Sequence, residues 1–263
     1  MTDTPVIVSR PTPHVQQVAI NRPEAKNAID EVTRHALIAS IEDTLSDGSV
    51  RALLLCGTEG VFCAGGDLAS MRGMTEEEAR SRMHSGHQLI QLLWNAEIPV
   101  VLALEKFAIG AGAGLALVAD YVVAGKNSRM NFPFLNIGLV PDWGSTHSLI
   151  RKAGWSVAKR LVLDRASLKG DELFDLGLVE SVVEDTAVMG AALEKAEDLS
   201  LLPRLAFRQF KERMRASPEP MASTLAAEET DQTNCFLSEE FSEGLTALQE
   251  KRRPDFLGIS SDG

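Results

Sequence analysis

The sequence lacks several features that would place it in a membrane, in a secreted disulfide-rich class or around zinc. It has no apolar run near the ~20 residues that a spanning helix needs, and its first residues lack the basic-then-apolar order of a signal peptide. Its cysteines, Cys56, Cys63 and Cys235, form no CxxC pair. Neither a disulfide framework nor a thiolate zinc site is therefore predicted, and the cysteines are expected to be small buried hydrophobic residues. We expect a cytoplasmic protein with no membrane partner.

The chain also has fewer basic than acidic residues. The chain carries 26 Lys and Arg against 37 Asp and Glu, which gives a net charge of −11. Binding to a phosphate backbone needs a basic surface, so nucleic acid is not an expected partner. An anionic small molecule would have to rely on a local group of basic residues.

The usual signatures of several enzyme classes are missing. The sequence has no GxSxG, GxxxxGK[ST] or HExxH pattern, which argues against a serine hydrolase, a nucleotide triphosphatase and a zinc peptidase. His84 and His87 share one face of an expected helix at i, i+3, but no third ligand accompanies them. No metal is therefore predicted.

Short apolar runs alternate with helical patterns along most of the chain. The pattern of residues 27–45 indicates one helix, and a second is expected from Thr75 to Asn95. Thr75 and Glu78 form a capping box there, and Glu76/Arg80 and Glu78/Arg82 are pairs one turn apart. Alternation of strands and helices predicts an α/β fold. The expected strands are Val6–Val8, Val15–Ile20, Ala52–Leu55, Val100–Ala103, Tyr121–Ala124 and Leu178–Val183.

The pattern becomes helical after Pro203. Pro218 and Pro220 mark a break, and one long acidic helix is expected over about 221–250. We therefore divide the chain into a core, residues 1–202, and a C-terminal helical region, residues 203–263. That region is either an oligomerisation element or a solvated helical cap.

Three segments have the composition of a ligand site. In the first, residues 61–68, Gly65 and Gly66 follow an expected strand. Glycine lets the backbone approach a ligand and aim an N–H at an oxygen, although an ordinary glycine turn has the same composition. In the second, residues 108–117, small residues open a helix whose first N–H groups are unpaired. The alternative is a helix kept narrow for packing, and Leu115 breaks the dinucleotide-binding fingerprint.

The third segment, residues 136–146, carries Asp142 beside Trp143 in a turn before a helix expected to start near Ser145. An apolar pocket raises the pKa of a carboxyl group, which would make Asp142 a usable base. The alternative is that Asp142 caps the helix, a position that aspartate favours.

In this order and spacing, the segments resemble the crotonase (enoyl-CoA hydratase/isomerase) superfamily. The resemblance begins at residues 19–28, continues through 62–68, 98–120 and 138–146, and extends to 177–179 and 250–256, so it covers most of the chain. It implies a spiral of ββα units with a C-terminal helical trimerisation region, and an assembly that is a homotrimer or a hexamer formed as a dimer of trimers.

The resemblance also implies the chemistry. The backbone N–H groups of Gly66 and Ala111 match the two that bind the thioester oxygen in that family, and such a donor is typically worth ~3 kcal/mol to the transition state. The two glutamates of the hydratases correspond to Gly114 and Phe134, which transfer no proton. Asp142 stands where enoyl-CoA isomerases and related ring-modifying isomerases keep a carboxylate, so it is the expected proton shuttle of an isomerase.

For the acyl-CoA thioester, the resemblance places Lys26 and Ala28 near the pantetheine and phosphates. It places Ala64, Asp67 and Leu68 near the adenine and the pantetheine arm. Lys251, in the basic cluster 251–253, would reach the phosphates from a neighbouring subunit. The alternative for this cluster is a solvated helix end. Coenzyme A is then part of the substrate, and no separate cofactor is expected.

Other reactions at the same site remain open. Aryl-CoA dehalogenases use an aspartate as nucleophile and a helical histidine as base, and His87 matches the position of that histidine. We expect His87, Phe134 and Trp143 to line the acyl pocket instead. Hydration, and a CoA-ester-binding protein of low activity, are the further alternatives.

Overall fold

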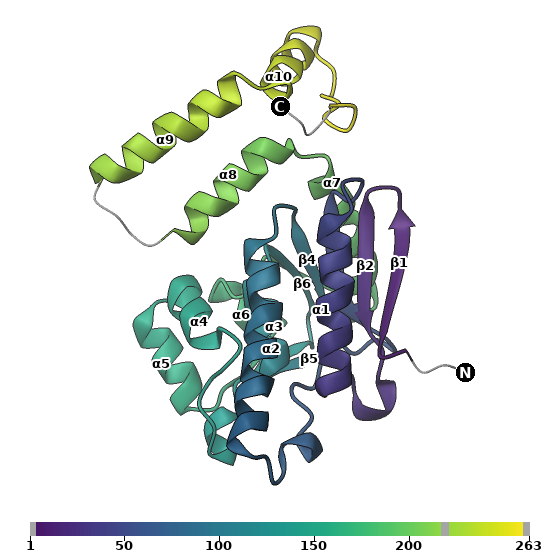
Figure 1. Ribbon diagram of the computed structural model, residues 1–263, viewed down its shortest axis with the longest axis vertical. Coiled ribbons are helices and arrows are strands. Elements are labelled where there is room, and N and C mark those ends of the chain that lie inside the picture. Colours follow the sequence, from purple (N-terminus) through teal and green to yellow (C-terminus); the bar gives the residue numbers. More distant parts are fainter. Residues whose placement is uncertain (1–3, 217–220, 260–263) are drawn as a thin grey trace.

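The computed structural model describes residues 4–216 and 221–259, and it has the predicted α/β class (Figure 1). Two sheets are surrounded by helices. The strands are β1 Val6–Thr12, β2 Val15–Ile20, β3 Ala52–Gly57, β4 Val100–Leu104, β5 Phe107–Ile109, β6 Tyr121–Gly125, β7 Arg129–Asn131, β8 Ser167–Lys169 and β9 Ser181–Val183. The helices are α1 Glu31–Ser46, α2 Glu76–Asn95, α3 Ala111–Val118, α4 Ser145–Ala153, α5 Trp155–Leu163, α6 Gly170–Asp175, α7 Val188–Ser200, α8 Arg204–Arg215, α9 Met221–Phe236 and α10 Glu239–Glu250, with short 3-10 turns at Pro23–Ala25, Ala69–Met71, Phe134–Ile137 and Asp185–Ala187.

The main sheet has the order β1-β2-β3-β4-β6-β9, and it is parallel except for the β1–β2 hairpin. Successive side chains of a strand point to opposite faces, so a sheet covered on both faces needs strands that are apolar throughout. In β3, Leu53 and Leu55 join the core formed with α1, α2 and α3, whereas Leu54 joins a second core that contains Ala192 of α7. The sheet is thus buried between α1 and α2 on one face and α7 on the other (Figure 1).

A second, three-stranded sheet joins β5, β7 and β8. The sequence did not indicate these strands, because three residues are too few to show a period of two. The small sheet matters for the site, since a β-bridge between Cys63 and Ala108 joins the chain after β3 to β5.

The predicted capping box of α2 is confirmed. Thr75 Oγ1 accepts from the N–H of Glu78, and the Glu78 carboxylate accepts from the N–H of Thr75. The expected pair of Glu76 with Arg80 forms at 2.8 Å. The prediction of an ion pair between Glu78 and Arg82 was wrong, because the Glu78 carboxylate bonds to Thr75 in the capping box.

The first long helix starts later than predicted. The sequence pattern indicated a start at residue 27, but α1 begins at Glu31 and is capped by Asp30, whose carboxylate accepts from the N–H of Thr33. Lys26 and Asn27 adopt φ of 53° and 57°, values outside the right-handed helical region. They belong to a loop that packs against the segment after β3.

The C-terminal region contains α8, α9 and α10. The expectation of one helix over 221–250 was wrong, because α9 ends at Phe236 and the side chain of Ser238 accepts from the N–H of Phe241 to start α10. A serine that bonds to the backbone in this way favours a helix start over a helix interior. The break expected at Pro218 and Pro220 lies outside the described residues.

Cys56 and Cys63 are buried and Cys235 is half-buried, and all three are unbridged. Burial raises the pKa of the thiols of Cys56 and Cys63 to about 12, so both stay protonated at neutral pH. Among the described residues, no helix combines the length and the apolar character that crossing a bilayer requires.

Candidate active site

The segment Cys63–Gly66 lies between two other pieces of chain and pairs with both. On one side, the N–H of Ile29 donates to the carbonyl of Gly65 at 2.7 Å, and the N–H of Asp67 donates to Ile29 at 3.0 Å. On the other side, Cys63 pairs with β5. Since residues 65 and 67 both turn toward Ile29, the N–H of the residue between them, Gly66, points to the opposite side. That side is where β5 leads into α3.

Ala111 is the first residue of α3, and it follows Gly110, whose φ is 52°. The first N–H groups of a helix have no acceptor within the helix. A β-carbon on Gly65, whose φ is 96°, would lie 2.5 Å from the carbonyl oxygen of Ile109 and 3.7 Å from the nitrogen of Ala111. The two predicted donor segments are therefore in contact at backbone level, and glycine at position 65 permits that contact.

Close packing of α3 explains Gly112. A β-carbon there would lie 2.9 Å from the Cβ and the carbonyl oxygen of Cys63. The narrow-helix alternative therefore applies to this glycine. It is compatible with a role for the neighbouring Ala111, because close packing brings the start of α3 to the segment of Cys63 and Gly65.

Asp142 lies in the loop before α4. The cap of α4 is Gly144 with no side-chain cap, so the capping alternative for the Asp142 carboxylate is wrong; only its backbone carbonyl accepts from Ser145, at 2.9 Å. Oδ1 of Asp142 is buried and has no hydrogen-bond partner among the described residues. Burial raises the pKa of this carboxyl group, while its own backbone N–H, Arg82 and His87 oppose the shift.

Trp143 is held between α2 and α3. A β-carbon on Gly114 would lie 2.7 Å from both the Cβ and the carbonyl oxygen of Trp143, and one on Gly86 would lie 3.0 Å from its indole Nε1. Phe134 is buried, and its ring edge lies 3.8 Å from the place of a β-carbon on Gly110. The Phe134 ring thus adjoins the start of α3, and Trp143, which follows Asp142 in the chain, packs one turn further along α3.

The sequence profile of a family described as enoyl-CoA hydratase/isomerase matches residues 12–258. The chain belongs to this family. It is 32% identical to the 2,3-dehydroadipyl-CoA hydratase of Escherichia coli over 96% of this chain and 98% of that protein. It is also 32% identical to the short-chain-enoyl-CoA hydratase of Clostridium acetobutylicum, over 91% and 92%.

Solved structures of the family have the same fold. The enoyl-CoA hydratase of Bacillus anthracis superposes with a TM-score of 0.91 at 26% identity, covering 97% of this chain and 99% of that one. An enoyl-CoA hydratase from Polaromonas gives 0.89 at 29% identity, over 95% and 98%. The crotonase-like fold expected from the sequence is thereby confirmed, and the enoyl-CoA hydratase/isomerase family acts on acyl-CoA thioesters.

The residues predicted to hold coenzyme A are brought together with one exception. The N–H of Ala64 donates to the carbonyl of Lys26 at 3.1 Å. Arg22, which the sequence did not single out, donates to the carbonyl of Ala28 at 2.7 Å and pairs with Asp67 at 3.2 Å. Their roles toward coenzyme A stay predictions. Leu68 follows directly and is 59% exposed.

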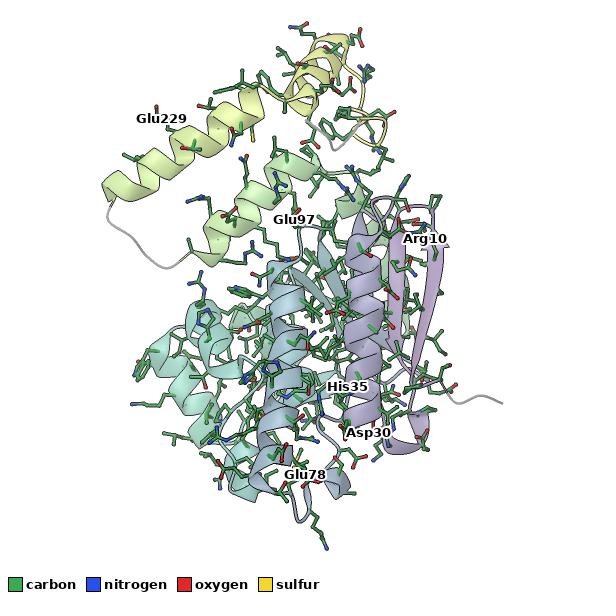
Figure 2. All side chains as sticks on the ribbon, viewed as in Figure 1. Arg10, Asp30, His35, Glu78, Glu97 and Glu229 are labelled. Carbon is green, nitrogen blue, oxygen red and sulfur yellow. The ribbon has the colours of Figure 1, made fainter. Side chains whose placement is uncertain are left out.

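Lys251 is the exception. It caps the C-terminal end of α10, which lies at the opposite end of the molecule from the amino ends of α1 and α2 (Figure 1). Asp30 and Glu78 mark those amino ends in Figure 2. Its neighbour Arg252 is already paired with Glu243 at 2.6 Å. Within one chain, Lys251 does not reach the other predicted residues, and its expected contact from a neighbouring subunit stays a prediction.

Sequence reasoning missed Arg82, which it assigned to a helix-surface pair. Arg82 is half-buried, and its Nη1 donates to Ser70 Oγ at 3.1 Å. A β-carbon on Gly66 would lie 2.8 Å from Nη2 of Arg82. His87, five residues further along α2, is exposed. The sequence shows that Arg82 and Gly86 are four residues apart and so share a helix face, but only the structure shows that this face meets Trp143.

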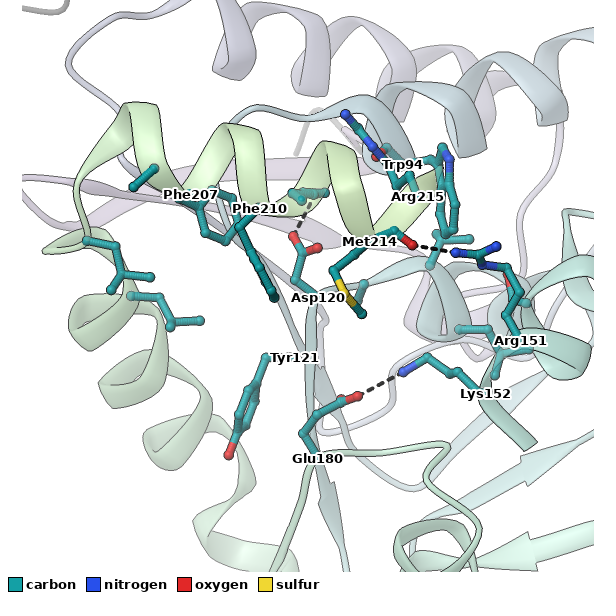
Figure 3. Close-up of a pocket in the computed structure, with 18 of the residues that line it drawn as sticks. Trp94, Asp120, Tyr121, Arg151, Lys152, Glu180, Phe207, Phe210, Met214 and Arg215 are labelled. Carbon is teal, nitrogen blue, oxygen red and sulfur yellow. Dashed lines mark hydrogen bonds and ion pairs between the residues drawn. The ribbon is translucent and has the colours of Figure 1, made fainter. Parts of the chain in front are cut away.

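A separate cavity of about 850 Å³ lies under α8. Figure 3 shows Trp94, Phe207, Phe210 and Met214 around it. None of the predicted site residues lines this cavity. It is therefore distinct from the candidate active site.

Proposed function

We propose that this member of the enoyl-CoA hydratase/isomerase family is an enoyl-CoA isomerase that shifts a double bond with Asp142 as the proton shuttle. One observation carries the proposal. Position 114 is a glycine and holds no proton-transferring side chain, and Trp143 lies 2.7 Å from where a β-carbon would be, so a larger residue does not fit there. Phe134 has no titratable group either, which leaves Asp142, the residue before Trp143, as the proposed proton-transferring group.

In this proposal, Asp142 removes the α proton of a 3-enoyl thioester. The electron pair moves to the thioester oxygen, and the N–H groups of Gly66 and Ala111 hold the resulting dienolate. Asp142 then returns the proton to the γ carbon, which gives the 2-enoyl thioester with no change in composition. Donors aimed at the oxygen where charge develops stabilise this intermediate more than the substrate.

The aromatic neighbours favour isomerisation over addition of water. Burial raises the pKa of Asp142, which brings it closer to the pH at which the same group accepts and then donates a proton. Trp143, the residue after Asp142, and Phe134 are both buried apolar side chains, and the proposal places them beside the reacting carbons. Fewer water molecules near the dienolate mean less competition with reprotonation.

Hydration is the second candidate, because the relatives from Escherichia coli and Clostridium acetobutylicum are named hydratases. It would require Asp142 to activate water alone. The dehalogenase alternative has less support, since its base would be His87, which is exposed on α2. A CoA-ester-binding protein without turnover would keep the donors and leave the ester unchanged.

The test is turnover of paired 3-enoyl-CoA and 2-enoyl-CoA thioesters, with products followed by mass. Wild type should convert the 3-enoyl esters at constant mass, and Asp142→Asn should lose this activity, whereas Asp164→Asn, at an exposed helix end, should keep it. A product heavier by one water would establish hydration instead. Activity that survives in Asp142→Asn would exclude Asp142 as the shuttle.

A further inference from the structure

Arg82 stands in a position where a positive charge contacts the candidate active site. Its Nη2 lies 2.8 Å from the place of a β-carbon on Gly66, beside the methyl end of Met71 at 2.6 Å from the same point. Because position 66 is glycine, the Arg82 guanidinium can occupy the space that a side chain at this position would fill. Since Gly66 is one of the two proposed oxygen-binding donors, the guanidinium lies within the reach of a short acyl chain bound there.

The face of α2 that carries Arg82 is the face that meets the Asp142 loop. Gly86, four residues on, contacts the indole of Trp143, and Ile90, a further four on, lies 3.4 Å from the place of a β-carbon on Gly144. Residues four apart lie one above the other on a helix. Arg82 is thus the first member of a row whose other members touch the loop.

Arg82 lacks a carboxylate partner at contact distance. Asp142, Asp67 and Asp30 all act on it electrostatically, yet among the described residues none lies within the 4 Å of an ion pair. Its side-chain hydrogen bond is to a neutral group, the hydroxyl of Ser70. Two of these carboxylates, Asp30 and Asp67, are instead paired with Arg22 at 3.3 and 3.2 Å.

A second guanidinium stands behind the first. Arg34 of α1 is 3% exposed, its Nε donates to Ser85 at 2.5 Å, and its Nη1 is buried without a partner in the described part of the chain. Burial, and then repulsion from Arg82, lower the pKa of Arg34. Asp30 and Glu31 act on Arg34 in the opposite direction, but among the described residues no carboxylate forms an ion pair with either guanidinium. A buried donor without a partner is costly, and an anion bound between the two groups would offset their repulsion.

We propose that Arg82, supported by Arg34, binds a carboxylate on the acyl group, so that the substrates are short acyl-CoA thioesters whose acyl chain carries a carboxylate. The guanidinium fork matches the two oxygens of a carboxylate and holds it in one orientation. This assignment rests on the proposed function only in placing the thioester oxygen at Gly66 and Ala111.

Binding of saturated thioesters tests the proposal without turnover, since these esters have no double bond to shift. Succinyl-, glutaryl- and adipyl-CoA would be compared with butanoyl-, pentanoyl- and hexanoyl-CoA by calorimetry. Wild type should bind at least one carboxylated ester about 30-fold tighter than its methyl-ended match, a factor equal to about 2 kcal/mol. Arg82→Gln should abolish this preference, and Arg82→Lys should keep part of it.

Arg80→Gln is the matched control, because Arg80 lies on the same helix, is exposed and pairs with Glu76. It should leave the preference unchanged. Equal affinities within every pair of esters for wild type, or a preference that survives in Arg82→Gln, would overturn the proposal. Asp142→Asn should retain the preference, so a failure of the isomerase assignment is distinguishable from a failure of carboxylate binding.

Discussion

Trp143 fills the space beside Gly114, so that a β-carbon at position 114 would lie 2.7 Å from the Cβ and 2.7 Å from the carbonyl oxygen of Trp143. The second of these contacts is with the backbone and does not depend on the indole ring. A proton-transferring residue cannot be introduced at position 114 without displacing the Asp142 loop. The contact therefore restricts the chemistry of the site to the groups already present.

Gly114→Ala should lower the free energy of unfolding by about 1–3 kcal/mol, because overpacking forces neighbouring chain to move. Removing the ring with Trp143→Gly should not restore the loss, since the carbonyl oxygen stays in place. Urea denaturation measures both. Gly190→Ala is the control: Gly190 lies in α7 with no atom within 4 Å of its β-carbon position, and alanine there should stabilise by up to about 1 kcal/mol. Equal stability of Gly114→Ala and wild type would contradict the steric argument.

Gly65→Ala should separate the two proposed donors. Its β-carbon would collide with the carbonyl of Ile109 at 2.5 Å, and its φ of 96° disfavours a side chain. Loss of one correctly placed donor lowers kcat by about 100-fold, and steady-state kinetics on the preferred ester measures it.

Gly73→Ala is the matched control for this change, because Gly73 has a φ of 72° but no atom within 4 Å of its β-carbon position. It shares the strain and lacks the collision, so its kcat should stay near that of wild type. Similar kcat values for Gly65→Ala and Gly73→Ala would contradict this argument. They would show that the close contact of Gly65 with the Ile109 carbonyl does not position the two donor N–H groups.

Isomerase activity should depend on the ionisation of Asp142. The base must be deprotonated to take the α proton, so kcat/KM should fall as pH falls through its pKa, which burial raises above the ordinary 3.8. Arg82 opposes this shift. Arg82→Gln should therefore raise the pKa of Asp142, so that the fall of kcat/KM at acidic pH, its acidic limb, moves to higher pH. A methyl-ended 3-enoyl-CoA is the substrate for this measurement. A limb that stays in place, or moves to lower pH, would mean that Asp142 is not the titrating group.

Lys211→Met should destabilise the attachment of α8. Lys211 is 5% exposed, and its Nζ lies 2.6 Å from the Asp120 carboxylate. Burial lowers the pKa of Lys211 and raises that of Asp120, while their mutual attraction opposes both shifts. Removing the lysine leaves a buried carboxylate without its cation, which costs about 3 kcal/mol.

Urea denaturation would measure this loss, with Lys159→Met, at an exposed position of α5, as the control. The double variant Lys211→Met/Asp120→Asn should recover part of the stability, because the uncompensated charge is gone. A double variant that is less stable than Lys211→Met would show that the carboxylate is held by other partners.

Features that depend on near neighbours in sequence were predictable. The capping box of Thr75 and Glu78 needs only residues three apart, and the buried strands β2 and β3 show as apolar runs. The three-residue strand β5 was missed because it is shorter than the pattern that defines a strand. The break before α10 was missed because the acidic pattern continues across Ser238, whose side chain caps the helix.

The sequence by itself determined the α/β alternation and the family, and it singled out the glycines at 65 and 66. These inferences follow from local composition and from the order of motifs. Only the tertiary structure decided that Arg82 meets Gly66 and that Trp143 closes the space at Gly114. Both contacts join segments at least 16 residues apart, and their distances depend on how α2 and α3 pack on the sheet. Local propensity acts over a few residues, whereas the geometry of the site is set by packing among distant ones.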